Sequence, residues 1–279
     1  MTLAISIKYP CGLVQRALAS LPNARLQEAV MLATDTRWTK YYSLHNNPTY
    51  EDVATKLFTF PDNNALIAYA GDVQSGEHCI SEFKANLESK KLKNMTVSLY
   101  MTQRTFQRIY HYHKKTRPRK VFPLYFLLGV RDNLGKCSLI YFSSPKFAPI
   151  FLEGVKGIGI RQACKVVEEN INQEIHKLDN VNIQEDSIHF GMLIAGTMYN
   201  LAVRSGEYNE IGGFMQFAIL DRKGITLPSL SWTEDPTGKT DIWHRATAQS
   251  NELTTYQTKY NLGPDYVHVN SFKLYSISD

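Results

Sequence analysis

Apolar and polar side chains alternate over the first residues of the chain, in Thr2–Tyr9 (TLAISIKY). Leu3, Ile5 and Ile7 fall on one side of this segment, and small or polar residues fall on the other. Successive side chains of a strand point to opposite faces, so the pattern predicts a half-buried β-strand. A second strand is predicted over Glu28–Trp38 (EAVMLATDTRW), which has an apolar centre.

Turn-forming residues separate the next two predicted strands. Thr55–Phe60 and Ala65–Ala70 flank the sequence PDNN at Pro61–Asn64. Proline presets the backbone of a turn, and Asp and Asn hydrogen-bond to their own backbone, so a hairpin is predicted here. Two helices are expected to follow, at Val73–Ser89 and at about Asn94–Lys115, because apolar residues recur with the spacing of a helix face.

The same order of strands and helices returns in the second half of the chain. The pattern predicts strands at Val121–Val130, Cys137–Ser143 and Phe147–Leu152, helices at Arg161–Leu178 and Ser187–Arg204, and a strand at Phe214–Leu220. Blocks of strands that alternate with pairs of helices are typical of packed sheets with helix layers outside them. We therefore expect an α+β fold.

The last part of the chain carries weaker patterns. Trp232–His244 is polar and rich in turn-forming residues, and Tyr266–Ile277 is expected to form a terminal pair of strands. The length of 279 residues fits one large domain. We predict a domain over residues 1–224, with an insertion at residues 13–26, and a C-terminal extension over residues 225–279 that packs on the same domain.

Composition narrows the classes of function. The net charge of +5 is a mild basic excess, whereas a dedicated nucleic-acid binder concentrates its basic residues. The four cysteines include no CxxC pair, which argues against a zinc site and fits a reducing, cytoplasmic setting. No secretory signal precedes the first strand, and apolar stretches such as Val121–Val130 have half of the ~20 residues that cross a bilayer. No phosphate-binding GxxxxGK(S/T) pattern occurs, and no cofactor is expected.

Three segments in this order resemble the proteasome-type subunits of the N-terminal-nucleophile (Ntn) hydrolases. Met1–Tyr9 with Gly12 resembles their first strand, Val30–Arg37 (VMLATDTR) their second, and Thr55–Gly71 their lysine-bearing hairpin. The direct Met-Thr start is similar to the bacterial members, including the Anbu type and the peptidase half of the heat-shock ATP-dependent protease. The resemblance spans Thr2–Leu220 and implies an α+β fold of the four-layer αββα sandwich type.

The resemblance also implies a catalytic centre. Thr2, freed by removal of Met1, would use its own amine as the base for its hydroxyl. Lys56 would place a positive charge beside Thr2, which favours the ionised hydroxyl and the neutral amine, and Asp35 would hold Lys56 in place. The Gly71 N–H would stabilise the oxyanion, a contribution of about 3–4 kcal/mol. The implied activity is a threonine peptidase, in which Lys56→Ala is expected to fold but to lose cleavage.

Each of these residues also has an interpretation without catalysis. Thr2 can simply follow the initiator methionine, and Asp35 can be a carboxylate at the end of a strand. Lys56 can be an edge-strand lysine that opposes aggregation, and Gly71 can be a strand terminator.

Two stretches depart from the pattern of the proteasome-type subunits. In GVKGIGIRQA, Ile158 stands where that pattern has a serine. In RSGEYNEIGG, Tyr208 and Ile211 stand near the places of an aspartate and a serine. The candidates to take the place of this aspartate and serine are Ser205, Glu207 and Glu210. A second hypothesis therefore stays open: a catalytically inactive proteasome-like subunit that acts as a structural ring or partner-binding component.

The resemblance also implies a set of partners. The peptidase would act on peptides or unfolded protein, with Trp38 as a candidate lining residue of its pocket. Self-assembly into a ring-like homo-oligomer is expected, with residues 13–26 and 225–279 as candidates for lining an interface or a pore mouth. A confined cleft would receive folded proteins only through a separate ATP-dependent unfoldase, because this chain has no phosphate loop. Neither a membrane nor a nucleic acid is an expected partner.

Overall fold

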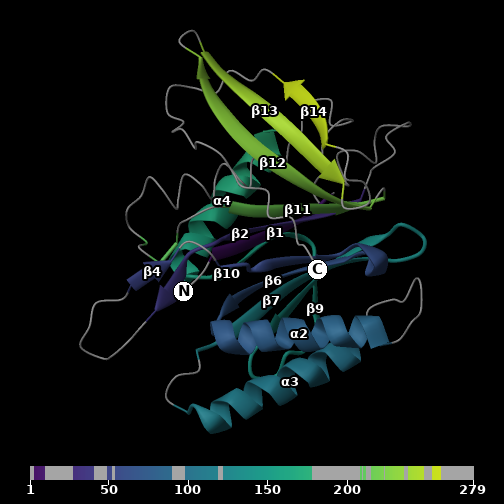
Figure 1. Ribbon diagram of the computed structural model, residues 1–279, viewed down its shortest axis with the longest axis vertical. Helices are drawn as coiled ribbons and strands as arrows, with labels where there is room; N and C mark the ends of the chain where they lie inside the picture. Colours follow the sequence, from purple (N-terminus) through teal and green to yellow (C-terminus); the bar gives the residue numbers. More distant parts are fainter. Residues whose placement is uncertain are drawn as a thin grey trace.

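The computed structural model describes residues 3–9, 28–40, 49–51, 54–89, 98–118, 122–177, 208, 210–211, 215–222, 224–235, 238–247 and 253–258. Most of the described strands belong to two antiparallel sheets, which lie face to face (Figure 1). The seven-stranded sheet has the order β10 (Gly154–Gly159), β1 (Leu3–Tyr9), β2 (Ala29–Asp35), β11 (Met215–Asp221), β12 (Gly224–Asp235), β13 (Gly238–Thr247) and β14 (Leu253–Thr258). The five-stranded sheet has the order β5 (Leu57–Phe60), β6 (Ala65–Gly71), β7 (Leu124–Arg131), β8 (Cys137–Ser143) and β9 (Ile150–Leu152).

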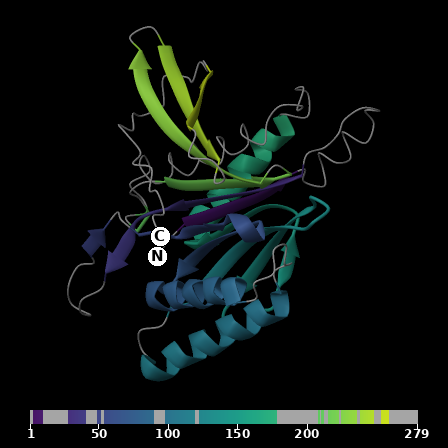
Figure 2. The ribbon, with the colours of Figure 1, turned by 45° about the vertical axis from the view of Figure 1, so that its right-hand side comes forward.

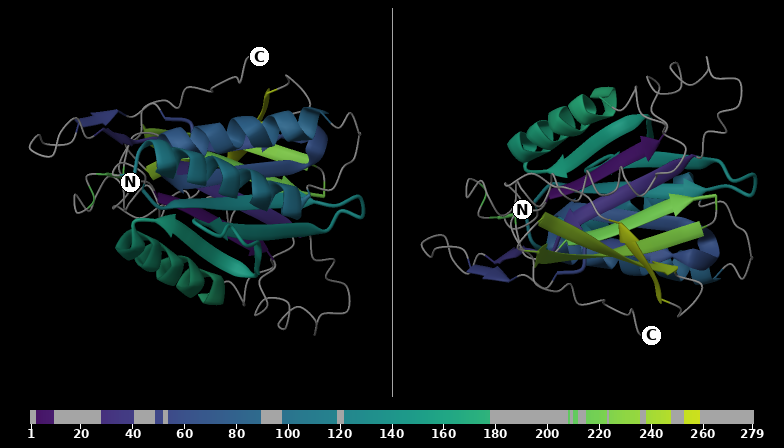
Figure 3. Two further views of the ribbon diagram at one scale, coloured as in Figure 1. Left: turned by 90° about the horizontal axis from the view of Figure 1, so that it is seen from below. Right: turned by 90° about the horizontal axis from the view of Figure 1, so that it is seen from above.

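Three helices among the described residues cover the outer faces of these sheets (Figures 2 and 3). They are α2 (Val73–Ser89) and α3 (Leu99–Thr116) on the five-stranded sheet, and α4 (Arg161–Lys177) on the seven-stranded sheet. The short strands β3 (Trp38–Lys40) and β4 (Thr49–Glu51), which the sequence patterns did not predict, form a separate two-stranded ribbon. The prediction of an α+β fold is confirmed as a mixed fold of sheets and helices, and the sheets are antiparallel.

The alternation along β1 assigns its side chains to two different cores. Leu3, Ile5 and Ile7 are fully buried in the cluster that includes α4, whereas Ala4 belongs to the cluster between the sheets. The inter-sheet cluster consists of small and branched apolar side chains, among them Ala4, Val30, Leu32, Leu66, Ala68, Leu127 and Leu139. Full burial of a Leu or Ile side chain contributes roughly 1.5–3 kcal/mol. This apolar layer therefore holds the two sheets together and sets where their strand ends meet.

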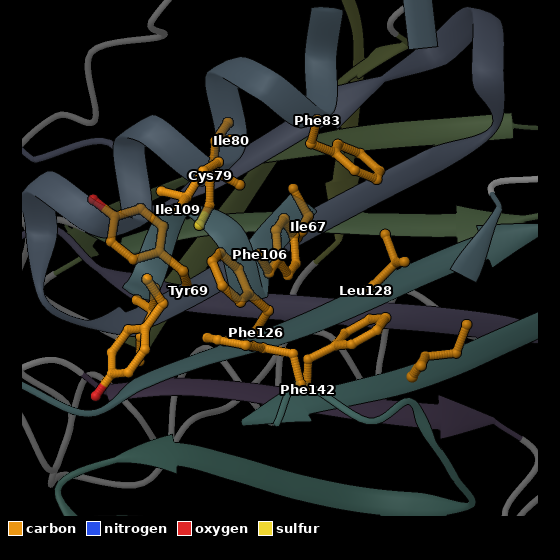
Figure 4. Packing of buried hydrophobic residues seen from close by; sticks show 14 of the residues in the cluster. Ile67, Tyr69, Cys79, Ile80, Phe83, Phe106, Ile109, Phe126, Leu128 and Phe142 are labelled. Carbon is orange, nitrogen blue, oxygen red and sulfur yellow. The ribbon is translucent and has the colours of Figure 1, made fainter. Parts of the chain in front are cut away.

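Aromatic rings fill the core between the five-stranded sheet and the helices α2 and α3 (Figure 4). Phe106 of α3 is fully buried and stacks on Phe126 of β7, with ring centroids 4.1 Å apart. Phe142 of β8 meets Phe106 edge-on, with centroids 5.7 Å apart. A Cβ at Gly76 of α2 would lie 2.4 Å from Cε2 of Tyr69, so the glycine lets this helix lie close against the tyrosine ring.

The structure corrects three of the sequence-based predictions. Gly154–Gly159, for which the sequence patterns predicted no strand, is strand β10, which pairs with β1. The strand predicted at Phe147–Leu152 begins only at Ile150, because Phe147 has a left-handed backbone with φ 43°. The polar stretch Trp232–His244 lies in the long hairpin of β12 and β13, since backbone pairing does not require apolar side chains.

Other predictions are confirmed or fall outside the described residues. The helix predicted at Val73–Ser89 is present with the same bounds, and the hairpin around Pro61–Asn64 is present as the antiparallel pair of β5 and β6. The insertion at residues 13–26, the helix Ser187–Arg204 and the strand pair Tyr266–Ile277 lie outside the described residues. None of the described helices is both long enough and apolar enough to cross a membrane.

We expect Phe106→Ala to lower the free energy of unfolding by about 3–5 kcal/mol, because truncation leaves a cavity among the stacked rings. Urea unfolding measures this difference, with Leu134→Ala as the control, since Leu134 is 89% exposed. The control is expected to stay within about 0.5 kcal/mol of the parent protein. Equal stability of the two variants would contradict the assignment of this aromatic core.

Candidate active site

The ends of several strands meet at one edge of the two sheets. In the seven-stranded sheet, β1 begins at Leu3, which pairs with Gly159 at the end of β10. β2 ends next to it at Asp35. In the five-stranded sheet, the Tyr69 N–H of β6 donates to the carbonyl oxygen of Lys56 at 3.1 Å, just before β5 begins. The packing of the sheets thus brings Asp35 and Lys56 to the same edge.

Asp35 is a buried carboxylate, with 4% of its surface exposed. Its Oδ1 accepts the backbone N–H of Leu3 at 3.1 Å, and its Oδ2 accepts the backbone N–H of Arg37 at 3.2 Å. One of these bonds ties the first described residue of β1 to the end of β2. Asp35 therefore fixes the start of β1, a role that its interpretation as a simple strand-end carboxylate does not include.

Lys56 is completely buried, and its ammonium group reaches from one sheet to the other. Its Nζ lies 3.0 Å from Oδ1 of Asp35, in an ion pair with no exposed lysine surface. It also donates to the carbonyl oxygen of Arg37. The alternative interpretation of Lys56 as a solvent-facing edge-strand lysine is therefore wrong. A buried ammonium that faces two acceptors can only be held in one place, because moving it would leave its charge unpaired.

Gln216 is a site residue that the sequence patterns did not single out. Its side-chain oxygen lies 2.8 Å from the backbone N of Lys56 and 3.2 Å from that of Leu57. The hydroxyl of Thr34 donates to the same oxygen at 3.2 Å. Gln216 therefore positions the Lys56 backbone from the opposite sheet. The available signal was a single amide side chain in the otherwise apolar strand MQFAIL.

Gly71 ends β6, two residues beyond the Tyr69 that pairs with Lys56. Its φ is +121°, and a Cβ added there would lie 1.9 Å from the carbonyl oxygen of Pro123. Both observations require glycine whatever the chemistry of the site, so the interpretation as a structural strand end accounts for the residue type. The backbone at Gly71 is held rigidly, which is the property that an oxyanion donor needs.

Thr2 lies outside the described residues, so its side chain is not placed. It is bonded to Leu3, and consecutive Cα atoms are about 3.8 Å apart. The Leu3 N–H itself donates to the carboxylate that binds Lys56. The described geometry therefore brings the predicted Asp35 and Lys56 together, beside the residue that follows Thr2.

The positions that depart from the proteasome-type pattern have packing roles. Ile158 is 3% exposed and belongs to the inter-sheet cluster. Ile211 is fully buried in the α4 cluster, and the partly buried Tyr208 packs against the same cluster. The carbonyl oxygen of Ile211 accepts a hydrogen bond from Nη1 of Arg37 at 3.4 Å. These three residues thus add apolar contacts. Of the candidates to replace the polar residues of the proteasome-type pattern, Ser205 and Glu207 lie outside the described residues.

The ribbon of β3 and β4 borders this site. The guanidinium of Arg37 lies over the Tyr50 ring, 5.5 Å from its centroid, and Trp38 begins β3. Trp38 is thus next in the chain to the residue whose carbonyl accepts Lys56 Nζ. Within the described ranges, no group of three or more His, Cys, Asp or Glu side chains is arranged to hold a metal ion.

Comparisons with known proteins bear on the fold. No family model matches the chain, and no curated protein matches it. Among solved structures, one that is similar is an Anbu (Gly-1) mutant from Hyphomicrobium sp. strain MC1, with 15% sequence identity and a TM-score of 0.51. The match covers 79% of this chain and 82% of that chain. The likeness is one of fold, and at that level it agrees with the resemblance found in the sequence.

The full burial of Lys56 changes the expectation that Lys56→Ala folds normally. Removal of the ammonium leaves Asp35 as a buried carboxylate without its cation, which typically costs about 3–5 kcal/mol. We expect a loss of this size in urea unfolding of Lys56→Ala. Adding Asp35→Asn to Lys56→Ala should recover part of the loss, because the buried negative charge is then absent. A Lys56→Ala protein as stable as the parent would show that the ion pair is not formed.

Proposed function

We propose that this protein is a proteasome-like threonine peptidase, which cleaves peptide bonds through the N-terminal Thr2 exposed by removal of Met1. The proposal includes its fold type, the four-layer αββα sandwich of the Ntn hydrolases. The observation that carries it is the buried contact of Asp35 with Lys56 Nζ and with the N–H of Leu3, the residue next to Thr2. A buried cation whose partner carboxylate also binds the N–H of the residue after Thr2 suits an N-terminal nucleophile.

In this mechanism the Thr2 amine takes the proton of the Thr2 hydroxyl as the oxygen attacks the peptide carbonyl carbon. The carbonyl becomes an oxyanion, to which the Gly71 backbone N–H donates a hydrogen bond. The C–N bond then breaks, and the amine of Thr2 returns the proton to the leaving nitrogen. An ester between Thr2 and the acyl part of the substrate is left. Water, deprotonated by the same amine, hydrolyses this ester and restores the hydroxyl.

Lys56 acts as a fixed charge in this mechanism. Its ammonium stabilises the developing negative charge on the Thr2 oxygen and favours the neutral form of the Thr2 amine. Asp35 and the Arg37 carbonyl hold the ammonium, and Gln216 holds the backbone that carries it. Because the pair is excluded from water, the positive charge of Lys56 acts more strongly than it would at the surface.

The second candidate function is a catalytically inactive proteasome-like subunit. The observation that favours it is the apolar packing of Ile158 and Ile211, where the proteasome-type pattern has serines. In that case the Asp35–Lys56 pair serves to join the two sheets. A peptidase and an inactive subunit differ in whether Thr2 has a free amine and reacts.

Cleavage of a panel of fluorogenic peptides, read together with the intact mass, tests the peptidase. We expect a mass that lacks Met1, activity in the parent protein and in Thr2→Ser, and a loss of at least about a thousandfold in Thr2→Ala. Thr2→Ser keeps a hydroxyl on the N-terminal residue and is the matched control. A protein that is inactive on every peptide, or that retains Met1, would favour the inactive subunit.

Assembly is a separate part of the proposal. We propose that the chain self-assembles into a ring-like homo-oligomer and takes up peptides or unfolded protein, with folded substrates delivered by a separate ATP-dependent unfoldase. Light scattering is expected to give a mass several times the 31.8 kDa of one chain. A mass of one chain over a wide range of concentration would contradict the assembly, whatever the outcome of the peptide assay.

A further inference from the structure

A polar cluster outside the proposed active site connects the two outer helices. His78 of α2 faces His113 of α3, with Nδ1 of His78 3.1 Å from Nε2 of His113. The other ring nitrogen of His113, Nδ1, lies 2.8 Å from a guanidinium nitrogen of Arg117. The same guanidinium nitrogen lies 3.0 Å from Oδ1 of Asp72, just before α2. We call the four residues Asp72, His78, His113 and Arg117 the helix latch.

The donors in the latch determine where the protons lie. Arginine has only donors, so Nδ1 of His113 must accept the bond from Arg117. A neutral imidazole carries one N–H, so the proton of His113 lies on Nε2 and is donated to Nδ1 of His78. His78 then carries its own proton on Nε2. The chain of bonds runs from Arg117 through His113 to His78, with both rings neutral.

The same assignment disfavours a metal ion between the two rings. A metal ligand must offer a lone pair, and Nε2 of His113 carries the proton in this arrangement. The neighbouring guanidinium would also repel a cation. The facing nitrogens are thus accounted for by a hydrogen bond.

A second proton on His113 is incompatible with the bonds of the latch. That proton would occupy Nδ1 of His113 and point at an N–H of Arg117, so the bond between them would be lost. Partial burial, the Arg117 guanidinium and His78 lower the pKa of His113 below its ordinary value of 6.5, and Asp72 acts in the opposite direction. Other titratable groups nearby are Tyr112, whose ring lies edge-on to both imidazoles, and Glu77 on α2, whose pKa is raised by burial. Tyr69 of β6 and Cys79 of α2 also interact with Asp72, and burial raises the pKa of each.

The latch acts on the turn that carries Gly71. Asp72 follows Gly71 directly, and its Oδ1 accepts the backbone N–H of Ser75 at 2.8 Å, so it caps the first turn of α2. Arg117, just after α3, holds this same carboxylate oxygen. Gly71 itself has no room for a side chain against Pro123. The end of α3 is thereby linked to the junction between β6 and α2.

We propose that the helix latch is a proton-sensitive lock on the junction between β6 and α2. With both imidazoles neutral, it fastens the end of α3 to the first turn of α2. At mildly acidic pH, protonation opens it, and the capped turn loses one of its anchors. A further consequence, which rests on the proposed function, is that the Gly71 N–H becomes a less rigid oxyanion donor as the latch opens.

The sign of the pH effect follows from the direction of the His113 shift. A base whose pKa is lower in the folded state than in the unfolded state binds its proton more readily when unfolded. The stabilisation that neutral His113 provides is complete at pH values above its pKa in the unfolded state, near 6.5. It is lost as the pH falls from there towards the lower pKa of His113 in the folded state. Stability should therefore decrease on acidification through this window.

Amide hydrogen exchange, corrected for the intrinsic effect of pH, measures the opening. The comparison uses two pH values, one unit below and one unit above the ordinary histidine pKa of 6.5. At the lower pH we expect the protection of the Ser75 and Gly76 amides to be roughly five-fold lower than at the higher pH. His113→Gln should show nearly the same protection at both pH values. The control is His111→Gln, an exposed histidine on the same helix, which should keep the pH response of the parent protein.

Exchange of the imidazole C–H, followed by mass spectrometry, gives a second measurement on the unmodified protein and does not require any variant to fold. We expect half-protonation of His113 below pH 6.5. Three results would overturn the proposed latch. They are half-protonation of His113 at or above pH 6.5, protection in the parent protein that does not change with pH, and a loss of the pH response in His111→Gln equal to that in His113→Gln. Binding of one equivalent of added Zn²⁺ that is lost in His113→Gln would overturn it as well. None of these readouts uses peptidase activity, so they stand apart from the test of Thr2.

Discussion

The buried ion pair of Lys56 and Asp35 is the interaction on which the site depends. It joins the two sheets at one edge, because Lys56 precedes β5 of one sheet and Asp35 ends β2 of the other. Neither charge is solvated, so each is tolerable only in the presence of the other and of the backbone groups around them. The arrangement of Leu3, Arg37 and Gln216 follows from this need, since their polar groups complete the bonding of the pair or of its backbone.

The apolar layer between the sheets makes this pair possible. Small residues such as Ala4 and Ala68 let the sheets approach closely, and branched residues such as Val30 and Leu66 fill the remaining space. The position taken by Ile158 belongs to the same layer, so one departure from the proteasome-type pattern adds to the packing that holds the sheets together. The outer helices contribute differently. Helices α2 and α3 cover the far face of the five-stranded sheet, and Gly71 and Asp72 form the junction between β6 and α2.

That junction connects two polar systems with different exposure to water. The Asp35–Lys56 pair is almost completely buried. The chain of His78, His113 and Arg117 is only partly buried, and the pKa of its His113 imidazole is lowered by this partial burial and by the Arg117 guanidinium. Asp72 belongs to the second system and follows Gly71, the last residue of the strand β6 whose Tyr69 bonds to the Lys56 carbonyl. The strand β6 therefore connects the buried ion pair to the partly buried cluster.

The sequence by itself determined the elements whose patterns are local. The two-residue period of β1, the turn at Pro61–Asn64 and the helix Val73–Ser89 could be predicted because each depends on neighbours a few residues apart. The order of Thr2, Asp35, Lys56 and Gly71 was also legible, through a resemblance and not through geometry. The strand at Gly154–Gly159 was missed, because glycine gives no side-chain period to detect.

Only the tertiary structure decided which of these residues meet. The burial of Lys56, the bond from Leu3 to Asp35 and the role of Gln216 depend on two sheets packed face to face, and no local pattern encodes that packing. The same holds for the facing rings of His78 and His113, which come from helices separated by other residues in the chain. Local periodicity sets which face of a strand or helix is apolar, whereas the contacts between distant polar groups are set by how those apolar faces pack.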